Sequence, residues 1–312
     1  MVNDSLGRPK VSVVVPVHGV ERYIERCARS LFTQTFKEIE FVFVNDCTTD
    51  RSMELLADVR KEFADASVQI VTLAQNVGLP QARHNGVEHA SGDYILHVDS
   101  DDWVEPDMVE RLYLQAVEND ADMVCCDWVE EHADHSERFS HLEVSRDAYY
   151  DAILALETDA YVWSRLCKRS LYDGLEFPTC NMFEDFVITS QLVAKARTIG
   201  FVHAPFYHYL RNNADSIRSS ANTKRILSQE LQNIYNVYQR VTTREPNQHQ
   251  RAVGRMLFAM GYHMVRHNLY DCLTEDQRRD ISQGIRTHLP QKELSFSMTK
   301  QIILWLRNMV GI

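Results

Sequence analysis

Three carboxylates stand close together in the segment Val98-Asp99-Ser-Asp101-Asp102-Trp103. They directly follow a short apolar run of the kind that forms a buried strand. Carboxylates this close repel one another unless a cation or hydrogen-bond donors offset the repulsion. Hard oxygen ligands suit Mg²⁺ or Mn²⁺, and Mg²⁺ sites often combine one or two carboxylates with substrate phosphates. The segment indicates either a divalent-metal site or the capped start of a helix, and by itself it favours neither.

A further carboxylate, Asp46, ends a second apolar run. It could accept hydrogen bonds from a base or ribose, or it could simply stabilise a turn. The turn after the first apolar run, Pro16-Val-His-Gly19, lacks the glycine spacing of dinucleotide-binding loops. The sequence also contains no P-loop motif and no Cys/His cluster at zinc spacing, so these chemistries are disfavoured.

The elements that must position these residues alternate along the first hundred residues. The hydrophobic patterns predict strands at 11–17, 39–44, 68–73 and 93–98, with helices at about 21–33, 50–63 and 80–89 between them. Repeated strand–helix units predict an α/β fold with a parallel sheet. Ligands of such sheets bind at the carboxyl ends of the strands, where Asp46 and Asp99 are expected.

The pattern changes after residue 106. We expect a helix near 107–119, a strand near 121–130, and then loops and helices to about 215. From residue 223 on, helices dominate and no strand pattern is convincing. The predicted organisation is therefore two halves of one nucleotide-binding unit, residues 1–105 and 106–217, followed by a helical region over 218–312.

Charge and composition limit the classes of partner. The chain of 312 residues has a net charge of −11, of which residues 1–220 carry −17 (20 Lys/Arg, 37 Asp/Glu) and residues 221–312 carry +6 (13 Lys/Arg, 7 Asp/Glu). An acidic front argues against nucleic-acid binding but allows phosphorylated ligands if a metal is present. There is no apolar run of membrane-spanning length, no secretory signal and no CxxC pair among the seven cysteines, which favours a cytoplasmic location.

Taken together, the motifs resemble the inverting family 2 glycosyltransferases of GT-A fold. The resemblance covers roughly residues 11–217, and the order and spacing of the motifs both agree across residues 11–107. The matching segments are Val11-Ser-Val-Val-Val-Pro16, Val44-Asn-Asp46, Thr49-Asp50, Asn76-Val-Gly78, Ala82-Arg-His-Asn85-Gly86, Gly92-Asp-Tyr-Ile95, Asp99-Ser-Asp-Asp102, Trp163-Ser-Arg-Leu-Cys-Lys168, Phe183-Glu-Asp185, Phe206-Tyr-His-Tyr209 and Asp215-Ser-Ile217.

The resemblance implies a fold and a set of roles. The fold would be a mostly parallel sheet flanked by helices, with a helical C-terminal region. Asp46 would read the nucleotide base, Asp99 the ribose or nearby polar groups, and Asp101 would hold Mn²⁺ or Mg²⁺. Asp185 would be the general base, at the start of a helix whose dipole would keep it ionised. The other residues expected at the donor are Pro16, Ser100, Arg211 (or His208) at the diphosphate, and Arg83, which either steadies the acidic cluster or is an ordinary surface residue.

The implied reaction is transfer of one hexose or amino-hexose from a nucleotide-diphosphate sugar, expected to be a UDP-sugar. The acceptor would be a hydroxyl of a cell-surface glycan, free or lipid-linked. The sequence has no Q-x-x-R-W motif and no following membrane spans, which argues against a processive polymerase. The alternatives are an inactive nucleotide-sugar-binding module and a nucleotidyltransferase. The presence of Asp99, Asp101 and Asp185 favours the enzyme, and the lack of a Gly-rich basic loop disfavours the nucleotidyltransferase.

Two features stay outside this assignment. Arg165 and Cys167 stand where the family often has Lys and Tyr, so that segment receives no firm role. Residues 299–310 have the pattern of a helix with a broad apolar face. Such a helix could lie on the inner face of the cell membrane as a peripheral anchor. Packing against the protein's own helices, or against a second subunit of a homodimer, is the favoured alternative.

Overall fold

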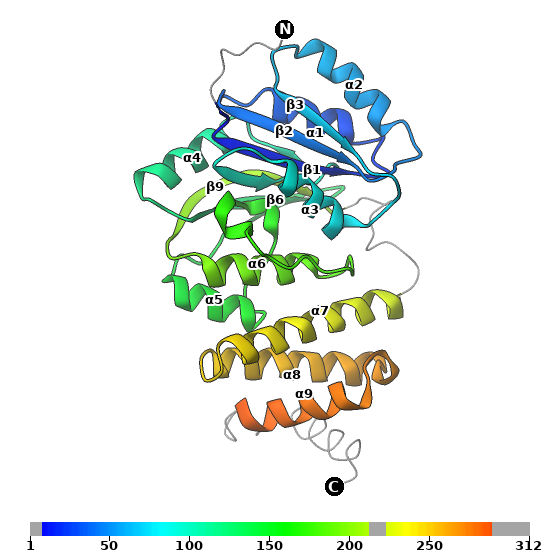
Figure 1. Cartoon of the computed structure of the whole chain (residues 1–312), viewed down its shortest axis with the longest axis vertical. Helices are drawn as coiled ribbons and strands as arrows, with labels where there is room; N and C mark the ends of the chain where they lie inside the picture. The colour runs from blue at the N-terminus through cyan, green and yellow to red at the C-terminus, as the bar shows by residue number, and fades with distance from the viewer. Residues whose placement is uncertain (1–7, 212–222, 289–312) are drawn as a thin grey trace.

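The computed structural model describes residues 8–211 and 223–288, and its centre is a nine-stranded sheet. The strand order is β3-β2-β1-β4-β8-β6-β9-β5, with β7 paired to β6. One hydrophobic cluster joins one face of the sheet to α1, α2 and α4. A second cluster joins the other face to α3, α5 and α6, and it continues into α7, α8 and α9 below them (Figure 1).

The first half confirms the predicted alternation of strands and helices. Strands β1, β2, β3 and β4 run parallel, in the order β3-β2-β1-β4. Their bounds, and those of the helices between them, lie within a few residues of the predicted ones. The elements are β1 (Val11–Val17), α1 (Ile24–Phe32), β2 (Ile39–Asn45), α2 (Ser52–Glu62), β3 (Val68–Thr72), α3 (Leu79–His89) and β4 (Tyr94–His97).

Strand β1 lies at the centre of the first half, between β2 and β4, and helices cover both of its faces. Every residue of the strand is buried, with Val13 and Val14 turned toward opposite clusters. Helix α3 approaches the sheet closely at Gly86, where a Cβ atom would lie 2.3 Å from Cγ1 of Val14 and 3.1 Å from Cγ2 of Val44. A side chain at this position would push α3 away from the strand ends that carry the polar residues.

The second half adds strands that the sequence analysis missed, because it predicted only loops and helices between residues 131 and 215. Strand β9 contains Gly200 and Pro205, is mostly half-buried, and has a register irregularity where it pairs with β6, so no regular alternation marks it. The elements are β5 (Trp103–Val104), α4 (Met108–Glu118), β6 (Met123–Glu131), β7 (Ser136–Phe139), α5 (Arg146–Leu154), β8 (Arg165–Lys168), α6 (Glu184–Lys195) and β9 (Ile199–Leu210).

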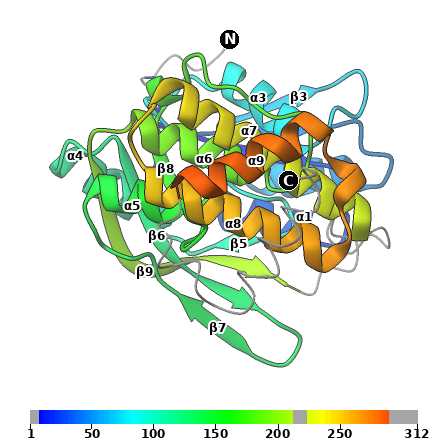
Figure 2. The same ribbon diagram turned by 90° about the horizontal axis from the view of Figure 1, so that it is seen from below.

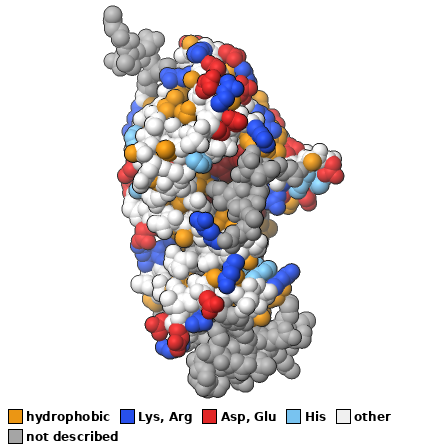
Figure 3. Space-filling view, turned by 90° about the vertical axis from the view of Figure 1, so that its right-hand side faces the viewer, with side chains coloured by type: hydrophobic (Ala, Val, Ile, Leu, Met, Phe, Trp, Pro, Cys, Tyr) orange, Lys and Arg blue, Asp and Glu red, His pale blue; other side chains and the backbone are white. Residues whose placement is uncertain are grey.

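These additional strands make the sheet mixed. Strand β8 runs antiparallel to both β4 and β6, whereas β6 and β9 are parallel. The short strand β5, directly after the acidic segment, pairs antiparallel with β9. Both predicted halves therefore share one sheet. The β6–β7 hairpin belongs to this sheet and projects from the body of the molecule (Figures 2 and 3).

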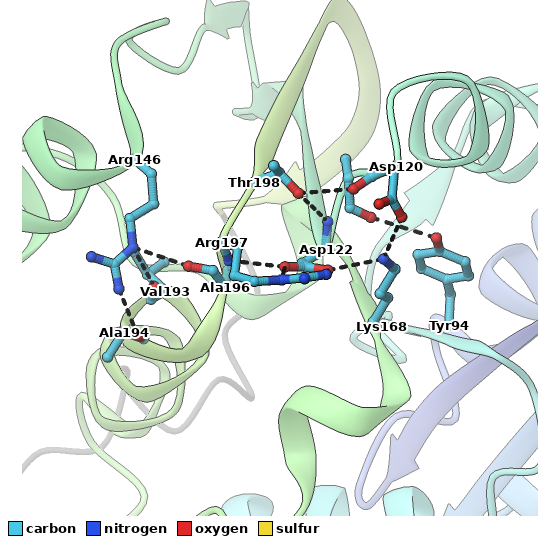
Figure 4. A network of polar contacts seen from close by, with 11 residues as sticks. Tyr94, Asp120, Asp122, Arg146, Lys168, Val193, Ala194, Ala196, Arg197 and Thr198 are labelled. Atoms are coloured by element: carbon cyan, nitrogen blue, oxygen red, sulfur yellow. Dashed lines mark hydrogen bonds and ion pairs between the residues drawn. The ribbon is translucent and has the colours of Figure 1, made fainter.

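A polar network ties the amino-terminal end of β6 to β8 and β9 (Figure 4). The carboxylate of Asp122 accepts hydrogen bonds from Nζ of Lys168 at 2.9 Å and from the backbone and guanidinium of Arg197. Nearby, Thr198 Oγ1 donates to the carbonyl of Asp120. Burial alone would raise the pKa of Asp122, but the bonds from Arg197 and Lys168 outweigh it and lower that pKa. The network fixes the ends of three strands opposite the edge where ligands are expected.

The helical C-terminal region is confirmed for the described residues. It comprises α7 (Thr223–Arg244), α8 (Gln250–His267) and α9 (Glu275–His288), which stack below α5 and α6 (Figure 1). None of the helices described over 8–211 and 223–288 is long and apolar enough to cross a membrane. The segment 299–310 lies outside the described residues, so its membrane or packing role stays a prediction.

Candidate functional site

A cavity of about 940 Å³ opens at the carboxyl ends of β1, β2 and β4, where the sequence analysis expected ligands. The sheet edge provides one wall, and the segments around residues 156–163 and 181–186 provide the opposite wall. The cavity brings together most of the predicted site residues. Those on its wall are Pro16, Asp46, Arg83, Asp99, Ser100, Asp101 and Asp185.

Arg83 connects the acidic residues of the two walls. Its fully buried guanidinium donates to Asp99 Oδ1 from Nη2 at 2.8 Å and to Glu184 Oε1 from Nε at 3.3 Å. Nη2 also lies 3.8 Å from Asp185 Oδ1. Burial alone would lower the pKa of Arg83, but the three carboxylates raise it, so the charge is retained. The alternative of a surface residue is wrong, and Arg83 steadies the acidic cluster.

The three clustered aspartates have different environments. Asp99 and Asp101 line the cavity, whereas Asp102 is buried behind them. Asp102 accepts hydrogen bonds from the hydroxyl of Tyr207 at 2.7 Å and from the backbone N–H of Leu210 at 2.8 Å. Burial, and then the charges of Asp101 and Asp99, raise the pKa of Asp102 well above its usual value. Asp102 thus joins the acidic segment to β9.

The helix-cap alternative for this segment is wrong. The next helix, α4, begins at Met108, and Asp107 is its N-cap residue. The acidic segment leads instead into the short strand β5. The mutual repulsion of its carboxylates is offset by Arg83 on one side and by β9 on the other.

Arg26, on α1, contacts the acidic segment, which the sequence analysis did not predict. Its Nη2 donates to the carbonyl oxygen of Asp101 at 2.9 Å, and its guanidinium lies 3.6 Å from the ring centre of Trp103. Trp103 in turn stacks on His208 with ring centres 4.9 Å apart. These contacts fix the backbone that carries Asp101. A lone arginine on an amphipathic helix gives no signal of this role in the sequence.

Asp46 is nearly buried, and both of its carboxylate oxygens are used. They accept from the backbone N–H groups of Val77 at 2.7 Å and Gly78 at 3.0 Å. Gly78 has a φ of +85°, and a Cβ atom there would lie 2.5 Å from Oδ1 of Asn181 on the opposite wall. Asp46 therefore holds the turn before α3 in a conformation that suits glycine. Its role at the nucleotide base stays a prediction.

Asp185 projects into the cavity from the first turn of α6, which begins at Glu184 after the N-cap residue Phe183. Asp185 is therefore not the N-cap residue of α6. Its side chain is 24% exposed, and Oδ1 accepts from the backbone N–H of Val162 at 3.4 Å. Burial raises the pKa of Asp185, and Arg83 only partly opposes this. Its neighbour Glu184 is buried, so burial and then Asp185 raise the pKa of Glu184 well above its usual value.

The aspartates on the cavity wall fit a hard divalent cation. Asp99 and Asp101 offer carboxylate oxygens at one wall, beside the space that a diphosphate would need. Within residues 8–211 and 223–288, they do not form part of a ready cluster of three ligand side chains. Such a cation would therefore depend on phosphate oxygens or water for its remaining ligands, as Mg²⁺ commonly does.

Two predicted diphosphate contacts are not among the residues that line the cavity. Arg211 Nε is 3.2 Å from Glu130 Oε2 on β6. His208 lies between two carboxylates, with ring nitrogens 2.9 Å from Glu105 and 2.8 Å from Glu131. Neither residue belongs to the cavity wall as described. Their roles at the diphosphate stay predictions.

The wall opposite the sheet edge is rich in aromatic side chains and depends on a buried arginine. Tyr161 stacks on Trp163 with ring centres 4.6 Å apart, and both residues line the cavity. Arg165 is fully buried. It donates to the carbonyl oxygens of Asp159, at 2.6 Å, and Tyr161. The segment around Arg165, to which the sequence assigned no firm role, thus shapes this wall.

Comparison with known proteins agrees with this arrangement. The model of the family described as glycosyl transferase family 2 matches residues 12–183, more than half of the chain. This chain belongs to that family. The match covers the four parallel strands, apart from the first residue of β1, and the acidic segment, and it ends at Phe183, just before the Glu184–Asp185 pair.

Relatives of this family 2 chain include bacterial glycosyltransferases. Glycosyltransferase GlyA of Streptococcus pneumoniae is 32% identical over 64% of this chain, which spans only 30% of GlyA. The uncharacterized glycosyltransferase EpsJ of Bacillus subtilis is 30% identical over 95% of this chain and 86% of its own length. Among solved structures, S. aureus TarS (residues 1–349, in complex with UDP-GlcNAc) has a TM-score of 0.75 at 17% identity. It covers 96% of this chain and 88% of that one, which shows a shared GT-A-like fold.

Proposed function

We propose that this protein is a metal-dependent, inverting and non-processive glycosyltransferase. It moves one hexose or amino-hexose from a UDP-sugar to a hydroxyl of a cell-surface glycan. The observation that carries the proposal is the single cavity in which Asp99 and Asp101 line one wall and Asp185 the other, joined through Arg83. The reaction needs carboxylates that hold a metal for the donor diphosphate. It also needs, close to them, a carboxylate that accepts the proton of the acceptor hydroxyl.

Each wall has its own task in this proposal. Asp101, with Asp99 beside it, would hold Mn²⁺ or Mg²⁺, and the metal would supply positive charge for the leaving diphosphate. Asp185 accepts the proton of the acceptor hydroxyl as that oxygen bonds to the anomeric carbon and the bond to the diphosphate breaks. Attack and departure on opposite sides invert the configuration. Arg83 keeps Asp185 and Asp99 in fixed relative positions.

The choice of substrates rests on two supports. TarS, which shares the fold, was solved with UDP-GlcNAc, and this supports a UDP-sugar donor. The stacked Tyr161 and Trp163 on the acceptor wall suit a sugar ring, because aromatic side chains present a large apolar surface with a polar edge. An acceptor that is itself a glycan agrees with this wall.

The test is a donor screen with a metal requirement. Purified protein is mixed with a panel of UDP- and GDP-sugars with Mn²⁺, with Mg²⁺ or with EDTA, and read by thermal shift and by slow donor hydrolysis. We expect a UDP-sugar to stabilise the protein and be hydrolysed only with metal.

Asp101→Asn should lose most activity and keep its fold, because a neutral amide is a poor ligand for a hard cation. The exposed Asp65→Asn is the matched control.

Full turnover after exhaustive chelation would overturn the metal assignment. Donor binding without hydrolysis or transfer to any glycan acceptor would indicate an inactive sugar-nucleotide-binding module instead.

A further inference from the structure

The tip of the β6–β7 hairpin carries a cluster of side chains that the proposed reaction does not use. The turn 132–135 joins the two strands and is closed by a hydrogen bond from His132 N to His135 O at 2.9 Å. The hairpin projects from the sheet in Figure 2, and in Figure 3 a projection with acidic and histidine side chains stands out at the right. The residues of this turn, 132–135, are not among those that line the cavity.

His132, His135 and Glu137 each offer one ligand atom, and the three atoms lie within 4.8 Å of one another. Among the described residues 8–211 and 223–288, this is the one group of three potential metal ligands that converges in this way. The two imidazole rings are parallel, with centres 4.4 Å apart. His135 is 57% exposed, so its ring can turn and bring its ligand atom closer to the other two. Two ligand atoms that each lie about 2.0 Å from a tetrahedral metal are roughly 3.3 Å from each other.

A carboxylate orients one of these rings. Nδ1 of His135 lies 2.8 Å from Oδ1 of Asp134. In a neutral ring that donates its Nδ1 proton to Asp134, the lone pair of Nε2 is left for a metal. A carboxylate on the far nitrogen is the usual second partner of a metal-binding histidine.

Charge at the tip favours a cation. Glu130 and Glu137 are directly opposite each other in the β6–β7 pairing, and like charges in this position destabilise a hairpin. Arg211 Nε lies 3.2 Å from Glu130 and offsets part of this repulsion, but Glu137 and Asp134 remain nearby and exposed. A cation bound between the strands would offset the rest.

We propose that His132, His135 and Glu137 form a binding site for a borderline divalent transition metal of the Zn²⁺ class. Imidazole ligands prefer Zn²⁺, Ni²⁺ or Cu²⁺ over Mg²⁺, so the site differs in chemistry from the carboxylates of Asp99 and Asp101 in the cavity. Ligands from the turn and from β7 are bridged by the metal, which stiffens the tip. Water completes the coordination at this exposed position.

The test is titration of the full chain with ZnCl₂ and NiCl₂ in excess Mg²⁺, which occupies sites made of carboxylates. Isothermal titration calorimetry should show one equivalent of Zn²⁺ that Mg²⁺ does not displace. The double variant His132→Ala/His135→Ala should bind at least ten-fold more weakly, and Glu137→Gln should weaken binding without removing the histidines. Circular dichroism checks that each variant is folded.

The matched control is His263→Ala/His267→Ala on α8, because these rings are also stacked, with centres 5.8 Å apart. This control should bind Zn²⁺ as the wild type does. The proposal is overturned if the control loses the bound equivalent, if the hairpin variants keep it, or if Mg²⁺ displaces it.

Discussion

At the scale of single residues, the cavity holds more negative than positive charge. Asp99, Glu184 and Asp185 all face the one guanidinium of Arg83. Oε2 of Glu184 and Nη1 of Arg83 are buried without a partner among the described residues. Removing one partner of a buried ion pair commonly costs 3–5 kcal/mol, roughly, because the other charge is left uncompensated. The buried charges around Arg83 therefore compensate one another only in part.

Asp185 is the residue whose replacement best separates binding from chemistry. We expect Asp185→Asn to keep donor affinity and to lower kcat by about 10²–10⁴-fold, the usual loss for a missing general base. Only the carboxylate form accepts a proton, and burial raises the pKa of Asp185 above its usual value. The kcat of the wild type should therefore fall, as pH decreases, at a higher pH than an ordinary aspartate would give. Calorimetry with the donor and a pH–rate profile measure both effects.

The exposed Asp173→Asn serves as a control and should match the wild type in both experiments. Weakened donor binding with unchanged turnover in Asp185→Asn would show that Asp185 is not the base.

At the scale of elements, the local hydrophobic pattern predicted the parallel strands of the first half but not the strands that depend on distant pairing. The run of buried valines in β1 and the alternation that follows it indicated the parallel strands, and hence the edge where Asp46 and Asp99 lie. Strands β8 and β9 were missed because their place depends on pairing with distant β4 and β6. For the same reason the link from Tyr207 to Asp102, across 105 positions in sequence, had no local signal.

Asp122 offers a test of the network that joins β6, β8 and β9 (Figure 4). Folding lowers the pKa of Asp122 below the pKa of about 3.9 that an aspartate has in the unfolded chain. The stabilisation from its carboxylate is therefore complete above the unfolded-state pKa and is lost as the pH falls through the lower folded-state pKa. We expect Asp122→Asn to reduce the free energy of unfolding at pH 7 by about 1–3 kcal/mol. The difference from the wild type should shrink below about pH 4. Urea denaturation over a pH series measures it.

The control for this experiment is Asp120→Asn, which removes another partner of Lys168. Asp120 is 86% exposed, whereas the side chain of Asp122 is 3% exposed, so the control should have a much smaller effect. Equal effects of the two variants, or no change with pH, would contradict the assigned role of Asp122.

At the scale of the whole molecule, the C-terminal helices support the cavity. Helices α7, α8 and α9 share one hydrophobic cluster with α5, α6 and the lower face of the sheet. Polar contacts cross the same boundary, since Arg240 on α7 donates to Oγ of Ser190 on α6 at 2.6 Å. Asn181 and Met182 line the cavity directly above α7, and Asn181 touches the glycine turn on the other wall. The described helices α7, α8 and α9 are thus joined to the wall of the cavity.

Asn233 on α7 is the most direct of these supports and carries the last prediction. It is buried, and its Nδ2 donates to the carbonyl oxygens of Met182 at 2.7 Å and Cys180 at 3.2 Å. Asn233→Ala leaves both carbonyls without this donor, so we expect a loss of about 1–3 kcal/mol in unfolding free energy. Because Met182 lines the cavity, KM for the substrates should rise more than kcat falls. Asn236→Ala, at an exposed position of the same helix, should change neither quantity. If Asn233→Ala destabilised the protein and left KM unchanged, apolar packing alone would hold the cavity wall.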